Sequence, residues 1–90
     1  MMRGMRQKGE PIFWFKVHGS GMQRAGEPDL SITYHGQSVK AELKQPGKKP
    51  TSLQIRRLEQ YRDAGAIAGV VTNTDELASL LDQARKRGGG

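Results

Sequence analysis

Residues 28–44 read PDLSITYHGQSVKAELK and decide the fold, because apolar and polar side chains alternate on both sides of His35-Gly36. Alternation with a period of two is typical of a β-strand with one buried face. Glycine adopts positive φ at little cost and histidine tolerates it better than most residues, so His35-Gly36 predicts a two-residue turn. The stretch therefore predicts an antiparallel hairpin with strands at 29–34 and 38–44.

A two-residue turn also fixes how the two strands pair. Tyr34 then lies opposite Gln37, and Asp29 lies opposite Glu42 with about 4.5–5.5 Å between their Cβ atoms. One face of the hairpin is predicted to be the core face, which carries Leu30, Ile32, Tyr34, Val39, Ala41 and Leu43. The other is predicted to be a wet or functional face, which carries Asp29, Ser31, Thr33, Lys40, Glu42 and Lys44.

The flanking residues predict the remaining elements. Residues 13–18 read FWFKVH and alternate as a further strand. Thr51 and Gln54 form a capping box, so a helix is expected from Thr51 to the stop at Gly65. The apolar side of that helix is expected to be Ile55, Leu58 and Tyr61.

The last third of the chain predicts a strand and a second helix. Residues 66–72 are a short apolar run typical of a buried strand. Asn73 and Glu76 form a second helix start, before an apolar stripe of Leu77, Leu80, Leu81 and Ala84. The predicted fold is α/β with a mixed sheet and the order β-β-β-α-β-α. The last strand should run parallel to its partner, because a helix connects the two.

Composition limits the possible classes of protein. The chain has 90 residues, 34% hydrophobic residues and no cysteine, so we expect one domain over 1–90 with flexible segments at 1–9 and 88–90. A disulfide scaffold and a cysteine zinc site are excluded. We find no secretory signal and no membrane-spanning stretch, and so expect a cytoplasmic protein. The net charge of +6, spread over both halves, favours nucleic acid as partner.

The opposed carboxylates of Asp29 and Glu42 are the chemical signal in the sequence. Two like charges directly across a sheet repel each other, so stability alone does not explain them. A divalent cation would remove the repulsion, and oxygen ligands suit Mg²⁺ or Mn²⁺. Lys44 follows Glu42 on the same face and would place an ammonium beside the metal. The alternative is that Asp29 merely begins a strand whose outer face carries solvated charges.

The wider pattern resembles the PD-(D/E)XK nuclease superfamily, and within it the stand-alone virus-type replication-repair nuclease (VRR-NUC) domain. The resemblance rests on residues 26–30 (GEPDL), on Glu42-Leu43-Lys44 thirteen positions after Asp29, and on Gln54 in the next helix. It covers residues 13–81 and implies a restriction-endonuclease-like sheet. It implies a metal-dependent DNA endonuclease that acts as a homodimer or higher oligomer on branched DNA such as Holliday junctions. Such a protein would work in a bacterial or virus-infected host cell.

The resemblance also assigns roles to residues. Metal ligands would be the carboxylates of Asp29 and Glu42 and the backbone carbonyl of Leu43, while Lys44 and Gln54 would be catalytic. Lys16 and His18 would lie near the scissile phosphate. From their positions on a loop and a helix, Lys48, Lys49 and Arg56 are candidates for DNA contact, or else simply solvated charges.

One feature departs from the family pattern. Family members usually carry a further glutamate on a helix before the first strand, whereas here Glu10 precedes Pro11, which disfavours helical backbone at Glu10. Glu10 is therefore a poor match for a ligand on a helix, and a non-catalytic nucleic-acid-binding module on the same fold stays open as the alternative. The sequence also leaves open whether the substrate is a junction, a flap, a nicked duplex or a single strand.

Overall fold

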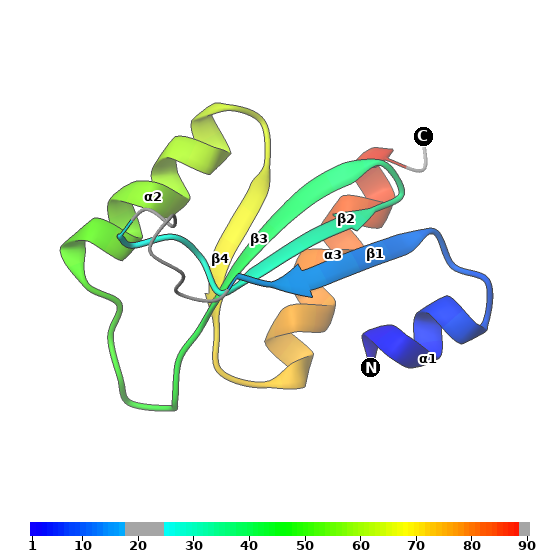
Figure 1. Cartoon of the computed structure of the whole chain (residues 1–90), viewed down its shortest axis with the longest axis horizontal. Helices are drawn as coiled ribbons and strands as arrows, with labels where there is room; N and C mark the ends of the chain where they lie inside the picture. The colour runs from blue at the N-terminus through cyan, green and yellow to red at the C-terminus, as the bar shows by residue number, and fades with distance from the viewer. Residues whose placement is uncertain (18–24, 89–90) are drawn as a thin grey trace.

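The computed structural model describes residues 1–17 and 25–88, which form one four-stranded mixed sheet with three helices (Figure 1). In chain order the elements are α1 (Met2–Gln7), β1 (Ile12–Lys16), β2 (Leu30–Tyr34), β3 (Gln37–Leu43), α2 (Ser52–Asp63), β4 (Ile67–Val71) and α3 (Thr74–Gly88). The strands lie in the spatial order β1-β2-β3-β4. From β1 onward the order is the predicted one, and the mixed α/β class is confirmed.

The hairpin has the predicted register. Leu30 pairs with Ala41 and Tyr34 with Gln37, and the turn residues His35 and Gly36 have φ of 50° and 75°. β1 lies antiparallel to β2, and the Val17 amide adds one further hydrogen bond of 2.8 Å to the Asp29 carbonyl. His18, the last residue of the predicted first strand, lies outside the described residues.

The core lies between the sheet and α3. Ile32, Val39 and Ala41 are almost completely buried there, against Leu81 and Ala84 of α3. The prediction that Leu43 belongs to this core is wrong, because Leu43 ends β3 beside the loop into α3 and keeps 39% of its surface exposed. The other predicted members of the core face are buried.

α2 covers the opposite face of the sheet, at its β3–β4 side. Its capping box is present as predicted, since the Thr51 amide donates to Gln54 Oε1 and the Gln54 amide donates to Thr51 Oγ1. β3 and β4 are parallel across this crossover, as expected. Leu58 of α2 is buried. Ile55, one turn earlier in the same helix, is 42% exposed, because the first turns of α2 extend past the strands (Figure 1).

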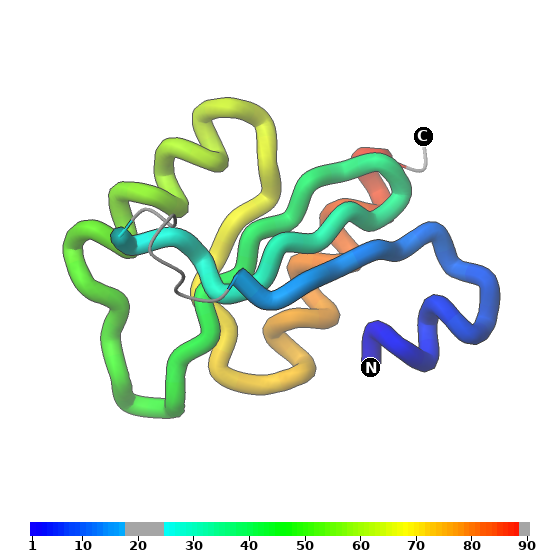
Figure 2. The backbone as a smooth tube through the Cα atoms, in the orientation of Figure 1, coloured from blue at the N-terminus to red at the C-terminus, as the bar shows by residue number. Residues whose placement is uncertain are grey.

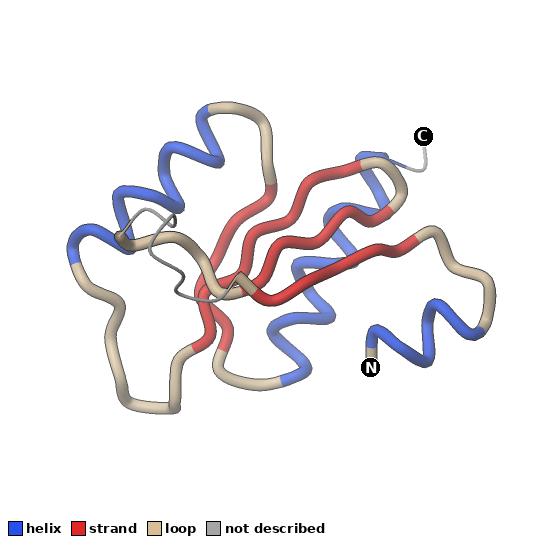
Figure 3. The backbone as a smooth tube through the Cα atoms, in the orientation of Figure 1, coloured by secondary structure: helices blue, strands red, loops and turns tan. Residues whose placement is uncertain are grey.

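The first residues of the chain differ from expectation. We expected residues 1–9 to be flexible, but Met2–Gln7 form α1, which lies beside β1 at the edge of the sheet (Figure 3). Met2 and Met5 are partly buried and pack against the core. A six-residue helix is too short to show a hydrophobic period, so no periodic pattern predicts it. At the other end α3 extends to Gly88. No helix among the described residues combines the length and apolar character needed to span a membrane.

Candidate metal and nucleic-acid site

The hairpin register brings Asp29 and Glu42 together at one end of the sheet. Asp29 immediately precedes β2 and Glu42 is the penultimate residue of β3. The Leu43 amide donates a 2.9 Å hydrogen bond to Asp29 Oδ2, which holds this carboxylate against the end of β3. The predicted juxtaposition of the two carboxylates is therefore present.

Among the described residues, Glu42 is the only polar or charged residue that is buried, with 1% of its surface exposed. Burial is the main cause that raises the pKa of Glu42 to about 8, and the hydrogen bond and charge of neighbouring Asp29 raise it further. The charge of Lys44 and the hydrogen bond from the Asp29 backbone act in the opposite direction. Glu42 Oε2 is buried without a hydrogen-bond partner among the described residues. An unsatisfied buried carboxylate oxygen calls for a ligand or a cation.

These donors fit a hard divalent cation. Carboxylate oxygens of Asp29 and Glu42, with the backbone carbonyl of Leu43, are the ligand type that Mg²⁺ and Mn²⁺ prefer. Within the described residues no third acidic or histidine side chain joins the two carboxylates. A cation held here would therefore complete its coordination with water or with a phosphate oxygen of the substrate.

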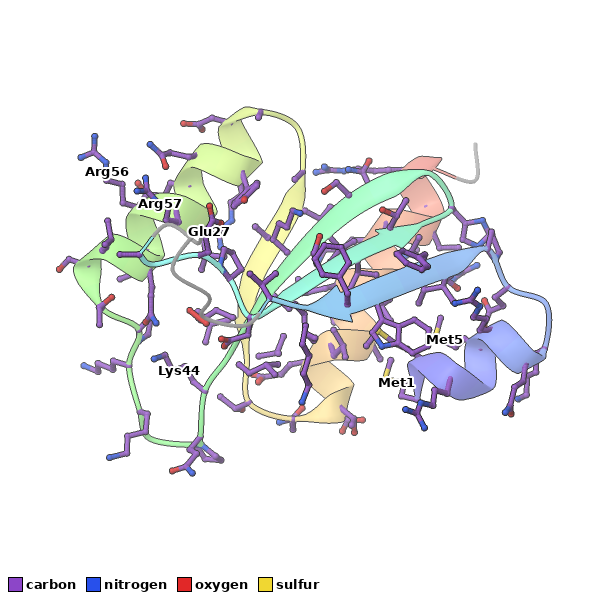
Figure 4. All side chains as sticks on the ribbon, in the orientation of Figure 1. Met1, Met5, Glu27, Lys44, Arg56 and Arg57 are labelled. Atoms are coloured by element: carbon purple, nitrogen blue, oxygen red, sulfur yellow. The ribbon has the colours of Figure 1, made fainter. Side chains whose placement is uncertain are left out.

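Lys44 extends the site just beyond the end of β3. Its backbone amide donates to the Val71 carbonyl at 3.0 Å, which continues the parallel pairing with β4. Figure 4 shows its side chain pointing from the strand toward the side where the chain returns to α2, and Figure 2 traces that return through residues 44–51. Its ammonium is close enough to Glu42 to lower the pKa of that carboxyl.

Gln54 lies in the first turn of α2 and already serves that helix. Its Oε1 accepts the 2.9 Å hydrogen bond of the capping box, which leaves its amide nitrogen for any contact with a substrate. The two roles considered for Gln54 are therefore compatible, since they use different atoms.

The candidate DNA contacts are spread around this end of the molecule. Lys16 is exposed at the end of β1, but strand alternation places it on the face opposite the acidic pair. Lys48 and Lys49 are exposed in the loop between β3 and α2. Arg56 is exposed on α2 and points outward, away from Lys44 (Figure 4). His18 cannot be placed, because it lies outside the described residues. Arg56 thus points away from Lys44, whereas the charge of Lys44 acts on Glu42.

Sequence reasoning missed the contacts that hold the segment before Asp29 against α2. The Tyr61 hydroxyl donates to Glu27 Oε2 at 2.7 Å, and Arg57 Nε donates to the Ala25 carbonyl at 3.3 Å. Gly26 has a φ of 80°, and a Cβ atom there would lie 2.7 Å from Leu53 Cγ. Only glycine allows this close approach. The sequence shows the glycine before Glu27, but its role can be recognised only once the position of α2 is known.

Glu10 serves a different part of the fold. It accepts a hydrogen bond from the hydroxyl of Tyr34, at the turn end of β2. Asp29 precedes the opposite end of that five-residue strand, about 16 Å away along the strand. α1 carries no acidic residue. Glu10 therefore does not supply the carboxylate that the sequence lacks on a first helix.

Together the fold and the site define a small α/β domain with a paired-carboxylate, lysine-flanked site at the end of a hairpin. Comparison with solved structures agrees with this class. A structure described as a VRR_NUC domain has a TM-score of 0.66 and 28% identity, over 86% of this chain and 83% of its own. Another, described as a VRR_NUC domain protein, has a TM-score of 0.66 and 25% identity, over 82% and 68%. The chain has the VRR_NUC fold. No family model and no curated protein matches its sequence.

Proposed function

We propose that this chain is a Mg²⁺- or Mn²⁺-dependent endodeoxyribonuclease that hydrolyses phosphodiester bonds in branched DNA, such as Holliday junctions. The observation that supports it best is the buried carboxyl group of Glu42, next to Asp29, which has one oxygen without a hydrogen-bond partner among the described residues. The VRR_NUC fold supports the same class of reaction. The net charge of +6 also favours DNA as the substrate. In this proposal the protein acts inside the cell.

Each residue of the site has a separate role in this proposal. Asp29, Glu42 and the Leu43 carbonyl would hold the cation, which supplies Lewis-acid stabilisation of charge on the phosphate. Asp29 is preoriented by the Leu43 amide. Lys44 would place its ammonium beside the reacting phosphate and stabilise the negative charge that develops there. Lys48 and Lys49 would bind neighbouring phosphates of the backbone.

A homodimer would suit a branched substrate, because a two-fold axis presents two identical sites to two strands of a junction.

The direct test of the nuclease activity is a cleavage assay with end-labelled four-way junction, linear duplex and single strand, in Mg²⁺, Mn²⁺ or EDTA. Metal-dependent cutting of the junction ahead of linear duplex is the expected result. DNA that is bound but uncut in every metal would contradict the proposal.

Gln54→Glu separates the two roles of that side chain. Glutamate also completes a capping box, so the melting temperature should stay within about 2 °C of wild type. It cannot donate from its side chain, and it adds negative charge near the substrate. We expect cleavage to fall about tenfold, measured with the junction substrate. Unchanged cleavage would restrict Gln54 to its structural role.

The alternative is a nucleic-acid-binding module without catalysis. One observation favours it: Glu10 lies at the far end of β2, so among the described residues two carboxylates and no third gather at the site. Salt-sensitive DNA binding without metal-dependent cleavage would establish this alternative.

A further inference from the structure

Two aromatic side chains stand exposed on β1. Phe13 and Phe15 keep 56% and 53% of their surfaces exposed, although large apolar residues are usually buried. They are two positions apart in one strand, so they share a face of the sheet. Their ring centroids are 6.5 Å apart, with the planes tilted by 54°.

This is the same face that carries the acidic pair. Phe15 pairs with Ser31, which pairs in turn with Lys40 of β3. The next set of paired residues on that face begins at Val17, whose amide donates a hydrogen bond to the Asp29 carbonyl, and it continues from Asp29 to Glu42. Successive sets lie two residues apart, about 7 Å along the strands. The two rings thus form an aromatic strip, Phe13 and Phe15, that leads toward the candidate metal site.

The aromatic strip is uncovered by the rest of the described chain. α2 packs on this face against β3 and β4, and within the described residues it contacts neither β1 nor β2. Arg6 of α1 places its guanidinium 5.7 Å from the centre of the Phe13 ring. Lys16 follows Phe15 and is exposed as well, but it alternates to the opposite face of the sheet. A cation therefore lies at the Phe13 end of the strip.

We propose that Phe13 and Phe15 stack the unpaired bases of a DNA strand whose backbone runs toward Asp29 and Glu42. The proposal rests on the proposed nuclease function and specifies its substrate as DNA with unpaired nucleotides next to the cut. Aromatic rings beside a cation are the usual platform for single-stranded nucleic acid, because rings bind bases and cations bind phosphates.

The test measures binding without cleavage. Fluorescence anisotropy in EDTA compares labelled oligo-dT with an abasic oligonucleotide of the same length and charge. Wild type should bind oligo-dT at least about tenfold more tightly, because two stacked bases contribute. The double variant Phe13→Leu, Phe15→Leu keeps apolar bulk but loses both rings. It should lose this preference while its affinity for the abasic strand stays unchanged.

Control variants distinguish stacking from apolar contact. Phe13→Tyr with Phe15→Tyr should keep the preference, since tyrosine also stacks. Leu53→Ala with Ile55→Ala removes two similarly exposed apolar side chains from α2 and should keep it as well. Failure of wild type to prefer oligo-dT would overturn the proposal. A double Leu variant that keeps the preference would overturn it too. A changed oligomeric state of that variant in analytical ultracentrifugation would then assign the two rings to a contact between copies. Because no result depends on cleavage, failure of the nuclease assay is a separate outcome.

Discussion

Lys44→Ala is expected to lower metal-dependent cleavage by about a hundredfold or more, with DNA affinity within about twofold of wild type. The loss should be large because the charge of Lys44 already acts on Glu42 and would act on charge that develops only during reaction. The effect on binding should be small, because one phosphate contact among several contributes little to affinity. Single-turnover cleavage and anisotropy binding on the same junction measure the two quantities.

Lys40→Ala is the matched control for that variant. Lys40 lies on the same strand and face, but its ammonium donates to Ser31 Oγ at 2.7 Å and lies 5.1 Å from the centre of the Tyr61 ring. It is therefore committed to the fold, and its removal should leave cleavage within a few-fold of wild type. Equal losses of cleavage and binding in Lys44→Ala would contradict the catalytic role.

The metal-free protein is expected to lose thermal stability as pH rises from about 5 to 8.5. The pKa of Glu42 is about 8 in the folded state against an ordinary value of 4.5, so the folded state holds the extra proton between these values. Stability conferred by that proton is complete below the ordinary pKa and is lost as pH rises through the folded pKa. We expect the melting temperature to fall by at least about 5 °C over this range.

Glu42→Gln should remove most of this pH dependence. The amide has nearly the shape of the carboxyl but does not ionise, so above pH 8 the variant should melt higher than wild type. Mn²⁺ should restore the wild type at high pH and leave the variant unchanged, because a cation stabilises the ionised pair. Scanning calorimetry from pH 5 to 8.5, with and without Mn²⁺, measures both effects. Parallel pH curves for the two proteins would contradict the assignment.

The hairpin and its register could be predicted because three independent features agree there. Strand alternation, the His35-Gly36 turn and the apolar face all require Asp29 to lie opposite Glu42. The capping box at Thr51 is equally local and was likewise predictable. Local rules of this kind place the carboxylates without knowledge of the rest of the chain.

Features that depend on packing could not be predicted in the same way. The pattern put Glu42 on a wet or functional face, and only the assembled sheet shows how deeply it is buried. Leu43 has the right period for the core but lies where α3 begins. The binding of Glu27 by Tyr61 joins residues 34 positions apart, so it depends on how α2 docks.

The proposed function depends on Asp29 and Glu42 binding a divalent cation. Calorimetric titration of Mn²⁺ into wild type, Asp29→Asn and Glu42→Gln at pH 8, without DNA, measures this binding. We predict saturable binding to wild type and at least about tenfold weaker binding to each variant. Equal binding by all three proteins, or none by wild type, would contradict the proposed function.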